Sequence, residues 1–75
     1  IPNASYRILC ALIFSNGKAL TREYLLEYAW GDSEKAVPNN VNVAISELRL
    51  ILKRTNIEII TERKIGYFLV FRKEL

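Results

Sequence analysis

The sequence contains no histidine and only one cysteine, Cys10. Without histidine, the chain cannot build a Cys₂His₂ zinc finger or a catalytic triad that uses histidine. The single cysteine excludes an internal disulfide, and its apolar surroundings, SYRILCALIF, favour a buried structural thiol over a reactive nucleophile. Paired carboxylates in a pocket pattern and a glycine-rich phosphate loop are also absent. We therefore expect no catalytic residues, no cofactor and no metal, so that the protein is not an enzyme.

Long apolar runs are missing as well. No run reaches the roughly 18 residues that a membrane-spanning helix needs, and no signal peptide opens the chain. About half of the 75 residues are apolar, which predicts one small globular domain over residues 1–75 rather than a disordered chain. The chain begins with Ile1 instead of methionine, and we interpret it as a fragment of a larger regulator or a processed chain.

Positive charge exceeds negative charge by only three, but the surplus is unevenly distributed. Residues 1–37 contain four lysines and arginines and four acidic residues, which cancel. Residues 38–75 contain seven cations against four anions, so the whole surplus lies in the second half. This distribution favours a polyanionic partner, although surplus cations also serve as an ordinary solubility device.

The stretch from Asn39 to Arg54 predicts a long amphipathic helix. Its apolar residues recur at the spacing of one buried stripe. They are Val41, Ile45, Leu48 and Leu52. Pro38 and the two asparagines after it mark the start, because asparagine is a strong N-cap and proline cannot lie deep inside a helix. The opposite face carries small polar groups and then cations, which suits entry into a nucleic-acid groove; an ordinary solvated face is the alternative.

Residues 5–15 predict a first helix, capped by Ser5 and ended by Asn16 and Gly17 in the left-handed conformation. This helix is apolar on nearly every side, and helices of that kind are usually enclosed. In so short a chain, we expect that something outside it is needed to cover one side of this helix.

A short strand and a second helix come next. Lys18–Leu20 is too short for a helix and predicts a brief strand, after which Thr21 caps a helix over residues 22–30. The polar residues 32–37 predict a loop. Two helices joined by a loop, the second with an outer face that could read a groove, suggest a helix-turn-helix, although this loop exceeds the usual ~3–4 residues.

After residue 56 the apolar period changes to two, which indicates strands. Residues 57–61 and 67–71 predict a β-hairpin with a basic turn, in which Gly66 can adopt positive φ. A hairpin alone is marginally stable, so we expect it to pack on the helices, with Lys18–Leu20 as a candidate third strand.

Three ordered motifs give the chain a specific resemblance. They are LTREYLLEYAWG at 20–31, VNVAISELRLIL at 41–52 and IITERKIGY at 59–67. With their spacing, these motifs resemble the C-terminal DNA-binding domain of OmpR/PhoB-type response regulators over about residues 5–71. The resemblance implies an α+β fold, a winged helix-turn-helix of three helices plus a C-terminal β-hairpin wing. The N-terminal sheet of that family, which covers one side of its first helix, is missing from this sequence.

The resemblance and the outer-face pattern together nominate DNA-contacting residues. Residues 39–54 match the recognition helix in the major groove, and residues 61–67 match the wing at the minor groove. The candidates on the recognition helix are Asn39, Asn42, Val43, Ala44, Ser46, Glu47, Arg49 and Lys53. The candidates for contacts to the DNA backbone are Thr21, Arg22 and Trp30. The wing candidates are Thr61, Arg63 and Lys64.

This reading face differs from the family pattern, which often has arginine where this chain has Asn39, Ser46 and Glu47. Asparagine is the bidentate partner of adenine, and the methyls of Val43 suit thymine, while Ala44 leaves room for a base edge. Glu47 would repel phosphate unless it accepts from a cytosine N4. We therefore predict an A/T-leaning operator in double-stranded DNA, and the resemblance implies that it is read as repeated half-sites.

The resemblance implies sequence-specific DNA binding by a bacterial transcriptional regulator of the two-component type. The usual wing of the family carries R-G-x-G-Y, and here Lys64 and Ile65 replace that pattern. With this change the wing resembles those of ToxR/CadC-type activators, which often carry this domain ahead of a membrane span. A cytoplasmic location, self-association on DNA and contact with RNA polymerase are implied too, and no small-molecule substrate is expected. The alternative is a winged-helix protein-interaction module, because Val43 and Leu50 put apolar groups on the outer face.

Overall fold

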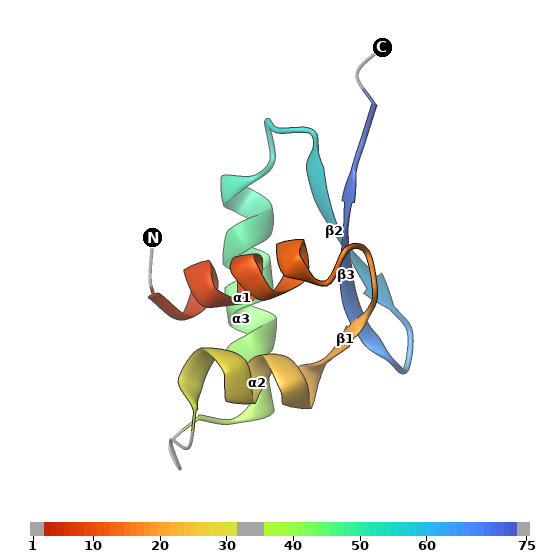
Figure 1. Cartoon of the computed structure of the whole chain (residues 1–75). Coiled ribbons are helices and arrows are strands. Elements are labelled where there is room, and N and C mark those ends of the chain that lie inside the picture. Colours follow the sequence, from red (N-terminus) through yellow and green to blue (C-terminus); the bar gives the residue numbers. More distant parts are fainter. Residues whose placement is uncertain (1–2, 32–35, 74–75) are drawn as a thin grey trace.

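The computed structural model describes residues 3–31 and 36–73. The chain forms helix α1 (Asn3–Phe14), strand β1 (Leu20–Thr21), helices α2 (Arg22–Trp30) and α3 (Pro38–Ile51), and strands β2 (Ile57–Glu62) and β3 (Gly66–Phe71). The strands make one antiparallel sheet in the order β1-β3-β2. Figure 1 shows α1 crossing α3, with the β2–β3 hairpin beside the helices. The predicted α+β architecture of three helices and a C-terminal hairpin is confirmed.

The buried stripe of α3 is the one that the apolar spacing predicts. Its four residues all belong to the core, together with buried residues of α1, α2 and the sheet. The helix ends at Ile51, three residues before the predicted end, so Lys53 and Arg54 lie in the turn that follows. The exposed residues between the stripe positions, among them Val43, Ser46 and Leu50, face outward.

The start of α3 differs in one detail from the prediction. The N-cap is Val37 rather than an asparagine, and Pro38 occupies the first turn. The Oδ1 atom of Asn40 accepts a hydrogen bond of 2.6 Å from the backbone N–H of Val37, so an asparagine supports the helix start from inside the first turn. Asn39 does not take part in this cap, and its side chain is exposed.

The prediction that Ser5 caps α1 is wrong, because the helix begins two residues earlier at Asn3. Ser5 lies inside the helix and is buried, and its hydroxyl donates to the Oε1 atom of Glu47 on α3 at 3.1 Å. The predicted end is confirmed: Asn16 and Gly17 have φ values of 55° and 86°. A serine that could have capped the helix instead connects α1 to α3.

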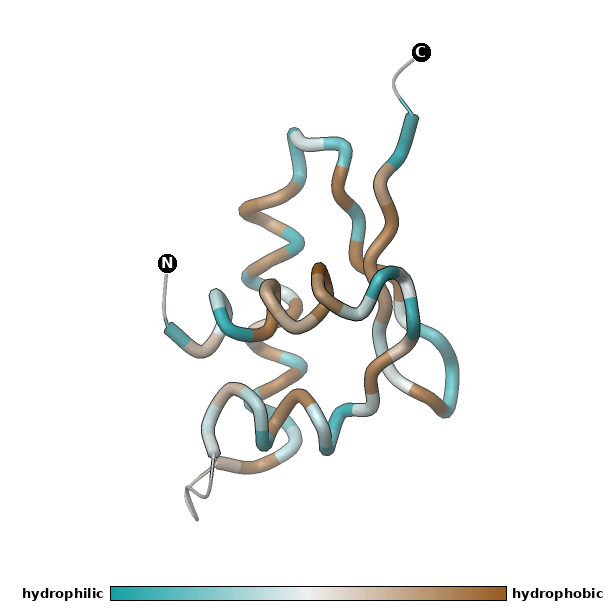
Figure 2. The backbone as a smooth tube through the Cα atoms, viewed as in Figure 1, coloured by the Kyte–Doolittle hydropathy of each residue, from teal (hydrophilic) through white to brown (hydrophobic). Residues whose placement is uncertain are grey.

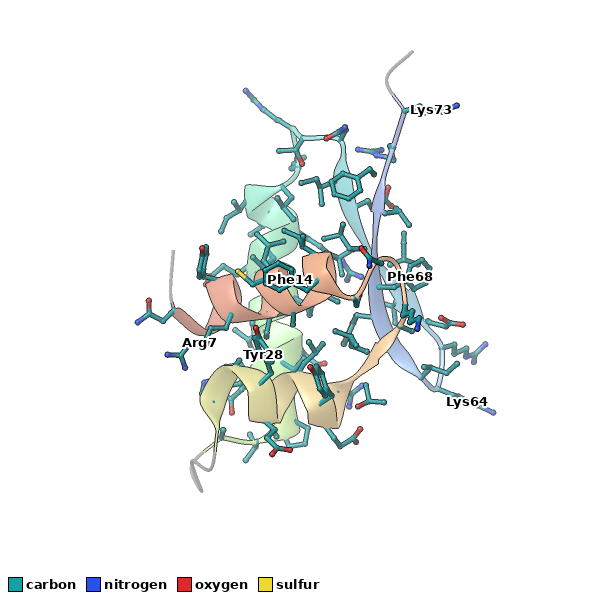
Figure 3. All side chains as sticks on the ribbon, viewed as in Figure 1. Arg7, Phe14, Tyr28, Lys64, Phe68 and Lys73 are labelled. Carbon is teal, nitrogen blue, oxygen red and sulfur yellow. The ribbon has the colours of Figure 1, made fainter. Side chains whose placement is uncertain are left out.

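One side of α1 is open to solvent, as its apolar composition suggests. Phe14 is 75% exposed, and Tyr6 is exposed too; Figure 3 shows Phe14 on the side of α1 away from α3. Cys10 lies at the edge of this face and is only partly buried, so the predicted burial of its thiol holds only in part. A hydrogen bond with the Cys10 thiol raises the pKa of the Tyr6 hydroxyl above its ordinary value. None of the described helices has the length and apolar character needed to cross a membrane.

The expected role of Gly66 is corrected by the sheet. Gly66 does not have positive φ; Lys64 in the turn does, with φ of 69°. Gly66 pairs with Thr21 of β1, and a Cβ added there would lie 1.9 Å from the carbonyl oxygen of Leu20. Only glycine therefore allows β1 to approach β3 this closely. The predicted third strand exists, but it spans Leu20–Thr21 and shares only Leu20 with the predicted Lys18–Leu20.

Candidate nucleic-acid interface

The exposed side of α3 carries most of the predicted reading residues. Asn39, Val43 and Ser46 all have exposed side chains, and Val43 is 57% exposed. Ala44 corrects the prediction, because it is buried. It is 5% exposed and belongs to the core, because it lies beside Ile45 on the buried side of the helix. Because Ala44 is buried, its small side chain cannot leave room for a base edge on the outer face of the helix.

Glu47 has a partner that the helical pattern alone could not reveal. The Ser5 hydroxyl of α1 donates to its carboxylate at 3.1 Å, and the Glu47 side chain is half-buried. A carboxylate that accepts this bond is directed towards α1, which lessens its repulsion of phosphate groups near the outer face of α3.

Asn42 is tied to the sheet. The hydroxyl of Tyr67 in β3 donates to its Oδ1 atom at 2.9 Å, and its Nδ2 atom lies 3.5 Å from Oδ1 of Asn39. Asn42 lies on the same side of the predicted helix as Asn39 and Ser46, which predicts an exposed side chain. In the structure, Asn42 is half-buried. Its amide group has a partner at each end.

Arg49 extends from α3 to strand β2. Its Nε and Nη2 atoms donate to the carbonyl oxygen of Ile59 at 3.2 and 3.0 Å, and Nη2 also donates to Oγ1 of Thr61 at 2.9 Å. A guanidinium has five N–H donors. The two hydrogens on Nη1 have no partner within the described residues, so the fixed cation can still donate outward.

Two hollows bring predicted residues from separate elements together. One, of about 360 Å³, lies between the end of α3 and β2, and Arg49, Lys53 and Thr61 contribute to its lining. The other, of about 230 Å³, lies between the start of α2 and the hairpin turn, and includes Arg22, Thr61 and Lys64. We call these five residues the helix–wing surface. Thr61 lines both hollows, and acidic residues lie among the cations, Glu58 in the first hollow and Glu23 and Glu62 in the second.

The hairpin turn presents cations at its tip. Arg63 and Lys64 are exposed, and the turn is closed by a hydrogen bond of 3.0 Å from the N–H of Ile65 to the carbonyl of Glu62. Figure 3 shows Lys64 pointing away from the helices, and Figure 2 shows that the connection between β2 and β3 is hydrophilic over most of its length. The turn therefore presents exposed cations away from the helices.

The two ends of α2 hold the remaining candidates. Thr21 caps the helix as predicted, because its Oγ1 atom accepts a hydrogen bond of 3.0 Å from the N–H of Tyr24. Arg22 follows it and is exposed. Trp30 at the other end is half-buried against the core, less enclosed than its apolar character suggests, and its indole N–H has no partner in residues 3–31 and 36–73. Among those residues, the structure also shows no acidic, cysteine or histidine cluster able to hold a metal ion.

The tertiary partners of three candidates were not predicted. They are Ser5 for Glu47, Tyr67 for Asn42, and Ile59 for Arg49. The alternation in β3 does place Tyr67 on the side of the sheet that packs on the helices. No signal within a single element indicates which polar group on α3 it meets.

Comparison with known proteins places this geometry in context. A family model described as "Transcriptional regulatory protein, C terminal" matches residues 1–69. A Staphylococcus epidermidis protein described as "Putative epidermin response regulator" is 37% identical over 76 residues. That match covers 100% of this chain and 37% of the relative, so the chain spans little more than a third of the relative's length.

Solved structures resemble the whole fold. The DNA-binding domain of the response regulator AdeR, in complex with an intercistronic region, matches with a TM-score of 0.78 and 25% identity, over 92% of this chain and 73% of that one. A protein from a family of streptococcal redox sensors, described as evolved from two-component response regulators, matches with a TM-score of 0.77 and 33% identity. This second match covers 95% of this chain and 31% of the other.

Proposed function

We propose, because this chain belongs to the family of C-terminal domains of transcriptional regulatory proteins, that α3 lies in the major groove of double-stranded DNA and the β2–β3 turn reaches the adjacent minor groove. The resemblance to OmpR/PhoB-type domains is confirmed by the family match and by the relatives. The function is sequence-specific DNA binding by a transcriptional regulator, which is not an enzymatic activity.

One observation supports the proposed mode of binding: the helix–wing surface brings cations of α2, the end of α3 and the wing turn to two hollows that share Thr61. Phosphate contacts supply most of the affinity of such proteins and fix their orientation on the duplex. Arg49 offers its Nη1 donors and Lys53 its ammonium to one strand. Arg22 and the exposed start of α2 face another phosphate, since helix N-termini favour anions, and the Trp30 indole N–H donates to the backbone.

Base reading falls to the exposed polar and apolar groups of α3. We assign bidentate adenine recognition to Asn39, whose side chain is exposed and outside the helix cap, and whose Oδ1 atom is approached only by Nδ2 of Asn42 at the long distance of 3.5 Å. The exposed methyls of Val43 suit the thymine C5-methyl, and Ser46 can donate or accept. These groups favour an A/T-leaning operator. Since this face offers few cations, one half-site should be bound weakly, and repeated half-sites would compensate by avidity.

A salt titration tests whether the helix–wing surface binds DNA. The logarithm of the affinity for random duplexes should fall linearly with the logarithm of salt concentration, by roughly 0.9 for each phosphate contact. Arg22→Ala should make the slope shallower. Lys18→Ala is a matched control, because Lys18 is an exposed cation outside the helix–wing surface, and should leave the slope unchanged. Absent or salt-independent binding would favour the protein-interaction alternative.

A selection from random duplexes tests the reading face. An A/T-rich winning motif that occurs as a repeat is the expected result. A G·C-rich motif, or none, would contradict the assignment of Asn39 and Val43 while leaving the fold unaffected. The ToxR-like wing, contact with RNA polymerase and a membrane anchor remain predictions from the sequence.

A further inference from the structure

The hydrogen bond between Tyr67 and Asn42 joins the sheet to the reading side of α3. Tyr67 is 7% exposed, and its hydroxyl donates to Oδ1 of Asn42 at 2.9 Å. At the other end of the same amide, Nδ2 lies 3.5 Å from Oδ1 of Asn39. A nearly buried hydroxyl seldom gives up its partner, because an unmade hydrogen bond away from water is costly. The plane and the direction of the Asn42 amide are therefore set from inside the protein.

We infer, resting on the proposed function, that Tyr67 is a positioning residue that determines which group Asn42 offers to a base. Bidentate recognition of adenine needs both ends of an asparagine amide, the oxygen for N6–H and the N–H for N7. With its oxygen turned towards Tyr67 and one N–H of Nδ2 directed to Asn39, Asn42 presents only the other N–H of Nδ2 to the groove. Asn42 is then not an adenine reader of the kind that the sequence suggests.

A donor of this kind has a definite preference. In the major groove, guanine presents N7 and O6 as acceptors, thymine presents O4 and adenine presents N7, whereas cytosine presents the N4 donor. Asn42 therefore discriminates against cytosine at one position of one strand and tolerates the other three bases. If Tyr67 lost its hydroxyl, the amide could turn and pair with adenine through both ends.

The test measures base preference at single positions of the selected operator. Asn42→Ala first identifies the base pair whose preference depends on Asn42. Tyr67→Phe should then raise the affinity for adenine at that pair, relative to guanine and thymine, by about fivefold, the low end of the value of a bidentate pair. Preferences at all other pairs should stay unchanged. Tyr28→Phe is the matched control, because Tyr28 is an exposed tyrosine on α2 whose hydroxyl has no partner in the described ranges.

The outcomes separate this inference from the proposed function. An unchanged preference in Tyr67→Phe, an equal loss at every base pair, or an Asn42→Ala variant with no position-specific effect would overturn the positioning role. The first two leave sequence-specific binding by the unaltered chain intact, whereas a chain that prefers no sequence at all would contradict the proposed function itself.

If the melting temperature shows that Tyr67→Phe is unfolded, a second variant still tests the inference. Asn42→Asp keeps an oxygen for the Tyr67 hydroxyl and removes the N–H donors. It should shift the preference at the same base pair towards cytosine, whose N4 donates to a carboxylate. No shift towards cytosine would overturn the inference.

Discussion

Arg49 on α3 and Thr61 on β2 are joined by a hydrogen bond of 2.9 Å from Nη2 to Oγ1. Two further bonds run from the same guanidinium to the carbonyl of Ile59. Helix α3 and strand β2 are thus connected by a side chain that also supplies a cation to the helix–wing surface. The charge of Arg49 serves the proposed phosphate contact, whereas its forked guanidinium connects α3 to β2. Different substitutions can distinguish these two roles.

Arg49→Ala should weaken binding to all sequences alike and make the salt slope shallower by about one unit. It should also lower the free energy of unfolding by about 1–3 kcal/mol, because the Ile59 carbonyl loses its charged donor. Arg49→Lys keeps the charge but cannot reproduce the fork. We expect it to retain the slope and lose stability, as salt titration and urea unfolding would show. An equally shallow slope in Arg49→Lys would contradict this separation.

Leu48→Ala should lower the free energy of unfolding by ~2–5 kcal/mol, the usual cost of truncating a buried leucine. Leu48 is 0% exposed, in the middle of the α3 stripe. Leu50, two residues later, is 74% exposed and provides the matched control, since Leu50→Ala should change stability by less than about 0.5 kcal/mol. Thermal unfolding measures both. Similar melting temperatures for the two variants would mean that the helix register is wrong.

Gly66→Ala should destabilise the sheet by at least about 2 kcal/mol, because the new Cβ would meet the backbone of β1 instead of a side chain that could move. Lys64→Gly in the same turn should be neutral or stabilising by up to about 1 kcal/mol, since it relieves a lysine at φ of 69°. Urea unfolding of both variants provides the measurement. If Gly66→Ala were as stable as the unaltered chain, β1 would not pair with β3 in solution.

Periodicity predicted the elements whose residues all obey one repeat. The α3 stripe and the β2–β3 hairpin were found because each side chain alternates between core and solvent at a fixed interval. Thr21 was found because an N-cap depends on residues close in sequence. The start of α1 was missed since Ser5 makes a contact 42 residues away rather than a local cap.

The candidate site was predicted less completely, because several of its residues have partners that are distant in sequence. Exposed positions such as Asn39 and Val43 follow from the helix register alone. The Ala44 burial follows from the width of the apolar stripe, which a count of four stripe residues underestimates. The partners of Asn42 and Arg49 depend on how β2 and β3 lie against α3, and that packing is a tertiary property that no single element records.

The last prediction concerns Arg63, an exposed cation of the wing turn. Arg63→Ala should weaken binding most on operators whose flanks are A-tracts, because their narrow minor groove has the deepest negative potential. We expect a loss of about tenfold there, the value of one charge-assisted hydrogen bond of roughly 1.5 kcal/mol. Lys18→Ala is the control, since Lys18 is an exposed cation that lines neither hollow of the helix–wing surface. Equal losses for Arg63→Ala on A-tract and G·C-rich flanks would show that the wing does not enter the minor groove.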